Sequence, residues 1–164
     1  MRALFVMAGL WAVGGVAHAS CDSITDVDQK YLCRAKVESK SYLCSSIVDG
    51  DLRNYCRAIT EPSITWCNSV NDGDLRNRCK AETASIVARA RGSSTAATQN
   101  CASISNSDDR YMCKAVVDKS STLCSSIRDS DKKYYCRALS EHSSGYCSSI
   151  SDSDLKAQCK SEVR

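Results

Sequence analysis

Apolar residues recur along the chain three and four positions apart, which is the spacing of one face of an α-helix. Leu52, Tyr55, Cys56 and Ile59 show the pattern most clearly, and the same spacing returns eighty residues later, where Lys132 interrupts it. Alternating patterns of the kind that strands show are weak. The chain is therefore predicted to consist of short amphipathic helices.

A second, shorter apolar face precedes each of these helices. Leu43, Cys44 and Ile47 form one example, and an acidic segment from Asp49 to Asp51 follows them. Carboxylates in such a segment suit the N-cap and first turn of the next helix, where backbone N–H groups lack partners. The pattern predicts a pair of short antiparallel helices joined by an acidic turn.

The cysteines indicate that this helix pair is repeated. Their spacing alternates between twelve and eleven residues, is interrupted once, and then runs through the same series again. A fixed period is typical of a repeat array, and the period here is 23 residues. The six units begin at Cys21, Cys44, Cys67, Cys101, Cys124 and Cys147.

A longer repeat contains the shorter one. Residues 21–84 and 101–164 are identical at roughly 30 of 64 aligned positions, which indicates that a three-unit module was duplicated. We predict an all-α, disulfide-stapled, solenoid-like repeat of short helical hairpins with two three-unit halves. Its segments are a signal peptide (1–19), the first module (20–91), a linker (92–100) and the second module (101–164).

The first residues have the features of a secretory signal. Arg2 is followed by an apolar run over residues 3–16 and by a small-x-small cleavage sequence at 17–19. This run is too short to span a bilayer comfortably, and no second one follows. We therefore expect a periplasmic or secreted protein without a transmembrane segment. Cys21 lies where a lipid-modified cysteine would lie, but it also fits the repeat.

Twelve cysteines in an exported chain predict disulfides. Joining cysteines twelve residues apart uses all of them, whereas joining those eleven apart leaves four without a partner. Each bridge of the first kind would stabilise the fold by roughly 3 kcal/mol. Connectivity cannot be proved from sequence alone, so the second scheme stays open, but the first is the one that we predict because it also joins cysteines on two facing helices. The first scheme pairs Cys21 with Cys33, Cys44 with Cys56, Cys67 with Cys79, Cys101 with Cys113, Cys124 with Cys136, and Cys147 with Cys159.

Few residues suit catalysis or cofactor binding. Removal of the signal leaves His142 as the only histidine, and no catalytic or phosphate-binding motif is present. No two cysteines lie closer than eleven residues, whereas zinc sites and redox centres favour Cys-x2-Cys. We expect no enzyme activity, no cofactor and no metal. The net charge is only +3, with both signs interspersed, so nucleic acid is not an expected partner.

The acidic turns resemble the beginning of a calcium loop. Two carboxylates one residue apart recur in most units, as in Asp49 and Asp51. A calcium loop also needs further side-chain ligands and a glutamate at its twelfth position, where this chain instead enters a helix and meets Lys or Arg. Helix N-caps account for every copy, and calcium binding stays open as an alternative.

Basic residues recur at the tenth and fourteenth positions of the units, one helical turn apart and off the apolar stripe. In one interpretation they form surface pairs with acidic residues, each worth a few tenths of a kcal/mol. In the other they align into a ribbon that faces an anionic glycan or lipid head group. These candidate binding residues are Lys30, Arg34, Arg53, Arg57, Arg76, Lys80, Arg110, Lys114, Lys133 and Arg137.

The combined features favour a binding protein. Repeat arrays commonly present an extended surface to another protein, so we expect a protein partner in the cell envelope, with an inhibitor or immunity protein as one form of this function. An anionic envelope polymer and a calcium-dependent module are the alternatives. The repeat resembles in style the Sel1-like αα-repeat solenoids, whose units are longer, and no residue role is carried over from them.

Overall fold

The computed structural model describes residues 21–91 and 100–163, without the side chains of residues 88–91. The expected signal peptide and nearly all of the expected linker lie outside the described residues. Within the described part the regular structure is helical and contains no strand. The predicted all-α repeat of disulfide-stapled hairpins is therefore confirmed.

Each unit contains a short first helix and a long second helix. In the first and fourth units the short helix is only a turn, at residues 21–22 and 100–102. The other short helices are η1 (Ser41–Ser46), α4 (Ile64–Asn68), η2 (Ser121–Ser126) and η3 (Ser144–Ser149). The long helices are α2 (Val27–Glu38), α3 (Gly50–Thr60), α5 (Gly73–Arg91), α7 (Ser107–Asp118), α8 (Ser130–Glu141) and α9 (Ser153–Glu162).

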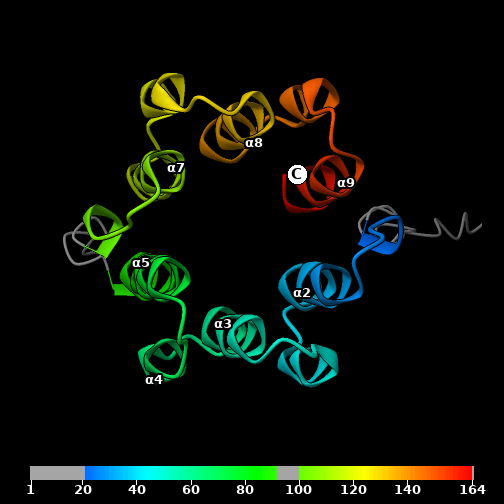
Figure 1. Ribbon diagram of the computed structural model, residues 1–164, viewed down its shortest axis with the longest axis vertical. Coiled ribbons are helices and arrows are strands. Elements are labelled where there is room, and N and C mark those ends of the chain that lie inside the picture. Colours follow the sequence, from blue (N-terminus) through cyan, green and yellow to red (C-terminus); the bar gives the residue numbers. More distant parts are fainter. Residues whose placement is uncertain (1–20, 92–99, 164) are drawn as a thin grey trace, which may run out of the picture.

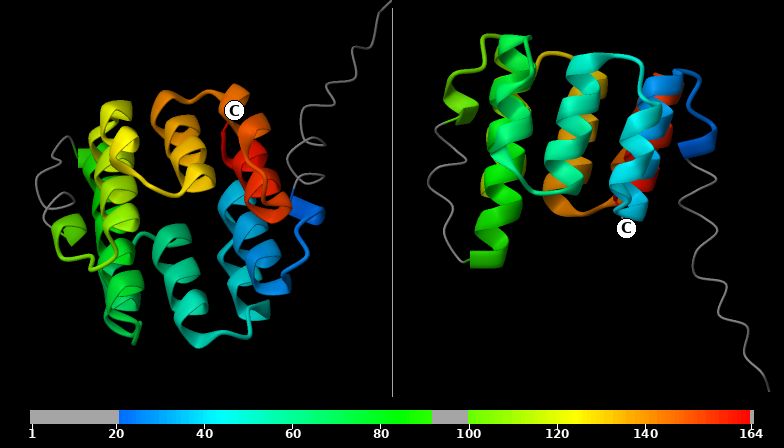
Figure 2. Two further views of the ribbon diagram at one scale, coloured as in Figure 1. Left: turned by 45° about the horizontal axis from the view of Figure 1, so that its top comes forward. Right: turned by 90° about the horizontal axis from the view of Figure 1, so that it is seen from below.

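The hairpins close into a ring (Figure 1). The long helices form its inner wall and the short helices its outer wall, and the last long helix, α9, packs against the first, α2. Because each short helix returns the chain to the starting end of the next unit, the long helices all run in the same direction (Figure 2). Closure of the array is a property that the repeat pattern did not predict.

Each unit carries one disulfide, which joins its short helix to its long helix. All six bridges connect cysteines twelve residues apart, as in the first of the two pairing schemes, with Cα–Cα distances of 5.5–5.7 Å. The described residues include no free cysteine. The two helices of every hairpin are thus covalently tied near the middle of the long helix.

The apolar core lies between the two walls of the ring. Every unit contributes its two cysteines, an isoleucine or valine at the fourth position, and a small residue at the fifteenth, and all of these are buried. The predicted apolar stripe faces two places. Cys56 is bonded to the outer wall and belongs to the core, whereas Leu52 lines the space enclosed by the ring. The fourth-position residues are Ile24, Ile47, Val70, Ile104, Ile127 and Ile150.

An aspartate at the eighth position of each unit joins that unit to the next, and we call these residues the clip aspartates. Asp51, for example, accepts hydrogen bonds from the backbone N–H groups of Asn71 (2.9 Å) and Asp72 (2.8 Å). The clip aspartates are Asp28, Asp51, Asp74, Asp108, Asp131 and Asp154.

The last clip aspartate closes the ring. Asp154 accepts hydrogen bonds from the backbone N–H of Thr25 (3.0 Å), from the Thr25 hydroxyl (2.6 Å), and from the backbone N–H of Asp26 (3.2 Å). The sixth unit therefore binds the first unit through the same backbone groups that every other unit uses to bind its neighbour.

The two modules meet at seams with less apolar contact than the junctions inside each module. Within each module the buried apolar residues form one large cluster. At the seams the clusters are small, so polar contacts contribute more of the attachment there. One seam buries Ala81, Cys101, Ile104 and Cys113, and the other buries Cys21, Ile24, Cys33 and Ala157.

Candidate binding site inside the ring

The inward faces of the long helices surround a lumen that contains three cavities. One of about 370 Å³ lies where the long helices begin, one of about 160 Å³ lies in the middle, and one of about 420 Å³ lies where they end. Arg78 and Tyr135 line both the first and the middle cavity, and Lys36 and Glu162 line both the middle and the last. The cavities therefore follow one another along the axis of the ring.

Polar residues enter the lumen wherever the apolar stripe is interrupted. They occupy the ninth, twelfth and sixteenth positions of their units, which carry Leu, Ile, Val, Met or Tyr in the other units. In the sequence such residues stand out only as interruptions of the apolar stripe, as Lys132 does, and this does not distinguish a lumen residue from a defect in the stripe. They are Gln29, Lys36, Arg78, Glu82, Asp109, Lys132, Gln158 and Glu162.

Two tyrosine–glutamate pairs occupy equivalent places in the two modules. The Tyr55 hydroxyl donates to Glu82 Oε2 at 2.5 Å, and the Tyr135 hydroxyl donates to Glu162 Oε2 at 2.8 Å. Both tyrosines are buried, and burial raises the pKa of each above that of free tyrosine. They therefore act as neutral donors that fix one oxygen of each carboxylate.

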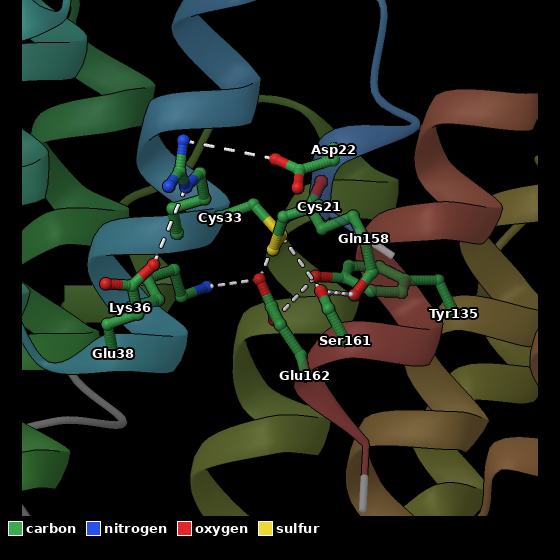
Figure 3. Close-up of a disulfide and its surroundings, with 10 residues drawn as sticks. Cys21, Asp22, Cys33, Lys36, Glu38, Tyr135, Gln158, Ser161 and Glu162 are labelled. Carbon is green, nitrogen blue, oxygen red and sulfur yellow. Dashed lines mark hydrogen bonds and ion pairs between the residues drawn. A yellow bond between two sulfur atoms is a disulfide. The ribbon is translucent and has the colours of Figure 1, made fainter. Parts of the chain in front are cut away.

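Lys36 connects the first unit to the last across the seam (Figure 3). Its Nζ donates to Glu162 Oε1 at 2.8 Å, and Gln158 Nε2 donates to the same oxygen at 3.0 Å. Burial is the largest influence on Lys36 and favours the neutral amine, but Glu162 and the neighbouring groups together outweigh burial and raise the pKa of Lys36. Burial likewise opposes ionisation of Glu162, but the charge of Lys36 and the hydrogen bonds from Lys36, Gln158 and Tyr135 together lower the pKa of Glu162. Both groups are therefore charged.

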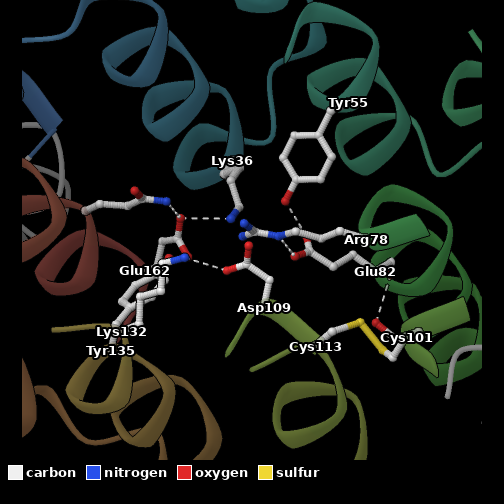
Figure 4. Close-up of polar contacts among 12 residues, drawn as sticks. Lys36, Tyr55, Arg78, Glu82, Cys101, Asp109, Cys113, Lys132, Tyr135 and Glu162 are labelled. Atoms are coloured by element: carbon white, nitrogen blue, oxygen red, sulfur yellow. Dashed lines mark hydrogen bonds and ion pairs between the residues drawn. A yellow bond between two sulfur atoms is a disulfide. The ribbon is translucent and has the colours of Figure 1, made fainter. Parts of the chain in front are cut away.

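Arg78 reaches into the lumen from α5 (Figure 4). Its Nε donates to Glu82 Oε1 at 2.9 Å, and its guanidinium lies 5.7 Å from the centre of the Tyr55 ring. Burial is the largest influence on Glu82 and opposes its ionisation, but the charges of Arg78 and Lys36 and the hydrogen bonds from Tyr55 and Arg78 together lower the pKa of this carboxyl. In the part of the chain that the structure describes, Nη1 and Nη2 of Arg78 have no hydrogen-bond acceptor.

A third ion pair lies near the end of the lumen where the long helices begin. Lys132 Nζ lies 2.7 Å from Asp109 Oδ1, and about a third of each side chain is exposed. Such exposed pairs contribute little to stability. The polar residues of the lumen thus form three cation–carboxylate pairs, and their formal charges cancel.

The basic residues proposed from the sequence do not line the cavities of the lumen, and they lie two in each of the first five units. Those at the tenth position have structural contacts: Arg53 donates to the Val48 carbonyl at 3.1 Å, and Arg110 donates to the Ile104 carbonyl at 2.7 Å. Arg76 has the equivalent bond. Of those at the fourteenth position, Arg57 stacks over the Trp66 ring at 4.9 Å, and Arg34 lies 3.5 Å from Glu38. None of Lys30, Lys80, Lys114, Lys133 and Arg137 lines the cavities.

The carboxylates of the acidic turns accept hydrogen bonds from backbone N–H groups. Asp49 at the sixth position accepts a hydrogen bond from the backbone N–H of Leu52 at 2.7 Å and so caps its own helix, while Asp51 at the eighth position binds the next unit. Among the described residues no three His, Cys, Asp or Glu side chains are grouped as metal ligands would be. Calcium binding stays a prediction, which a thermal shift on adding calcium or a chelator would test.

No protein-family model, curated protein or solved structure matches this chain. None of the described helices combines the length with the apolar composition that crossing a membrane requires.

Proposed function

We propose that this chain is an exported, disulfide-stapled scaffold that binds another protein of the cell envelope through the outer surface of its first module. A ring that is bridged in every unit changes shape little, so it would lose little conformational entropy on binding a partner. Export is supported by the six disulfides, which persist only in an oxidising compartment.

The observation that carries this proposal is the uneven distribution of exposed apolar side chains. Val48 is 82% exposed, Tyr42 65%, Val27 58% and Ile64 46%, and all four belong to the first module. Single exposed apolar residues are common, but the second module forms the same hairpins without them, so folding does not require them. Their counterparts in the second module are Arg128, Thr122, Ser107 and Ser144.

Site-specific photo-crosslinking tests the proposal with a control inside the same molecule. A photoreactive residue is placed at Val48 in one variant and at Arg128, its counterpart, in another, and each protein is incubated with envelope proteins of the producing cell. We expect one defined adduct at residue 48 and none at residue 128. In a further variant the photoreactive residue is placed at Ile64, where the same adduct is expected. Adding the substitution V48R, which copies the second module, would leave the fold intact and abolish the adduct at residue 64.

Equal labelling at residues 48 and 128, or no protein adduct at either, would overturn the proposal. An adduct that persists at Ile64 in V48R would show that the two residues belong to different surfaces and would remove the role assigned to Val48.

Binding of an anionic envelope polymer is the second candidate function. It is favoured by the presence of basic residues in every unit around the ring, and it is weakened by the hydrogen bonds that Arg53 and Arg110 donate to backbone carbonyls. Joint neutralisation of Arg53, Arg57, Arg76 and Lys80 should then remove salt-sensitive binding to a polyanion. Binding that is unchanged in this variant would exclude the basic residues as the site.

A further inference from the structure

The two glutamates of the lumen accept hydrogen bonds at every carboxylate oxygen. Both oxygens of Glu82 are used, by Arg78 Nε and by the Tyr55 hydroxyl. Both oxygens of Glu162 are used as well, one by Lys36 and a glutamine and the other by a tyrosine. The two glutamates therefore act as positioning groups for the cations, and a third carboxylate of the cavity, Asp109, is paired with Lys132.

The cations, in contrast, retain free donors. Among the contacts of the described residues, Arg78 donates a hydrogen bond only through its Nε. Its two terminal NH2 groups are therefore available to a ligand. Lys36 uses one of the three N–H bonds of its ammonium in the bond to Glu162. A ligand that complements this interior must supply acceptors.

Both cations face one space. Lys36 and Arg78 line the middle cavity of about 160 Å³, and Figure 4 shows the ammonium and the guanidinium pointing toward the same part of the lumen. Because each cation is already paired with a glutamate, the attraction for an anion would come from their free N–H groups and not from a surplus of positive charge. The planar guanidinium also matches a carboxylate, which it can bind through two parallel hydrogen bonds.

The rest of the cavity wall has a polar part, which includes Asp109, Ser85 and Tyr135, and an apolar part. Met112, Val116, Leu139 and Ile86 line the middle cavity, and Val116 and Leu139 continue into the wider cavity of about 420 Å³. That volume is within the range of about 300–1,000 Å³ that small-molecule sites commonly have. Lys119 and His142 line the wider cavity, where the long helices end.

We propose that the lumen binds a small organic acid, with its carboxylate on Arg78 and Lys36 and its aliphatic chain along Val116 and Leu139 toward the wider cavity. This site lies inside the ring, whereas the proposed protein-binding surface lies outside it, so either proposal can fail without the other.

Calorimetric titration of the mature protein with hexanoate tests the site. R78Q copies the residue that the second module carries at the equivalent position, Gln158, and should weaken hexanoate binding by about tenfold or more because the paired hydrogen bonds are lost. K160Q removes one positive charge from an exposed residue outside the lumen and should leave the affinity unchanged. Hexanamide, which keeps the chain and lacks the charge, should bind about tenfold more weakly than hexanoate.

A second measurement uses the unaltered protein, so its result does not depend on whether a variant folds. Met112 is the only methionine of the mature chain, and its side chain lines the middle cavity. Its methyl resonance should shift on addition of hexanoate to the unaltered protein. The proposal is overturned if millimolar hexanoate neither binds nor shifts this resonance, if R78Q binds it as tightly as the unaltered protein, or if inorganic phosphate binds as tightly as hexanoate.

Discussion

Two aspartates one residue apart have different tasks in the acidic turns. The first, such as Asp49, caps its own helix, and the second, such as Asp51, accepts two backbone hydrogen bonds from the next unit. The hydrogen bonds from the next unit lower the pKa of the clip aspartates below that of a free aspartate; the main donors are backbone N–H groups, except at Asp154, where the Thr25 hydroxyl comes first. The two aspartates resemble the first ligands of a calcium loop, but one of them caps a helix and the other joins two units.

Lowering the pH should weaken all the junctions between units over the same pH range. Because the pKa of each clip aspartate is lower in the folded ring than in the unfolded chain, its contribution to stability is fully present above about pH 4 and is lost as the pH falls through the lowered value. The urea midpoint should therefore decline between pH 4 and pH 2. D51N removes one of these groups, so its midpoint should decline less over that interval, and an identical decline would contradict the assignment.

Loss of the Asp154 carboxylate should open the ring at the seam. D154N removes the charged acceptor for Thr25 and Asp26, and few apolar contacts remain there to compensate. Hydrogen exchange at the amides of Thr25 and Asp26 should become faster. D51N removes an equivalent link inside a module, where the apolar cluster is large, so it should leave the Thr25 and Asp26 amides protected. Equal exchange at the seam in both variants would show that Asp154 has no special role in closure.

At the scale of helices and hairpins, local chemistry was enough to predict much of the structure. The stripe containing Leu52 and Tyr55 and the cap at Asp49 are enough to predict a helix here, which the structure shows as α3 (Gly50–Thr60). The short first helix was expected too, although η1 (Ser41–Ser46) proves to be a 3-10 helix. Helix periodicity and capping depend on neighbours within a few residues, so a single sequence carries them.

The inward polar residues and the closure of the array could not be predicted in the same way. Arg78 and Lys36 each occupy a position that is apolar in most other units, and nothing local distinguishes a lumen residue from a defect in the stripe. Closure depends on a small rotation between successive units that accumulates around the whole array. The contact of Asp154 with Thr25 joins residues 129 positions apart, which no local pattern encodes.

A single disulfide should contribute to stability without being needed for the fold. The bridge between Cys124 and Cys136 closes a loop of twelve residues inside one hairpin, so the double substitution C124A/C136A should lower the free energy of unfolding by about 3 kcal/mol. The clip aspartates on either side, Asp108 and Asp131, still bind their neighbours. Denaturant titration measures the loss, and far-ultraviolet circular dichroism should show unchanged helix content. A collapse of the helix signal would mean that the hairpin depends on its bridge.

At the scale of the whole molecule, the clip aspartates make equivalent contacts at the two seams of the ring. Asp74 binds the backbone N–H groups of Ser105 and Asn106 at one seam, and Asp154 binds those of Thr25 and Asp26 at the other. Each set of residues is the counterpart of the other after a shift of eighty positions. The molecule therefore has an approximate two-fold axis along the lumen, which also relates the two tyrosine–glutamate pairs.

The second module alone should form a ring from two copies. In a chain of residues 100–164, Asp154 of one copy would meet Ser105 and Asn106 of the other, which repeats the contact that Asp74 makes in the intact ring. Light scattering after size-exclusion chromatography should give twice the mass of the chain. D154N should shift this species to the monomer mass, and a folded monomer of the unaltered module would contradict the equivalence of the seams.

Closure also changes how the molecule can begin to unfold. An open repeat array has two end units with one neighbour each, so it frays from its ends and needs polar capping units there. In the ring each unit has a neighbour on both sides, with α9 packed against α2, and none of the units is specialised as a cap. A unit can leave only if two junctions break at once. The ring should therefore resist stepwise fraying and unfold in one cooperative step.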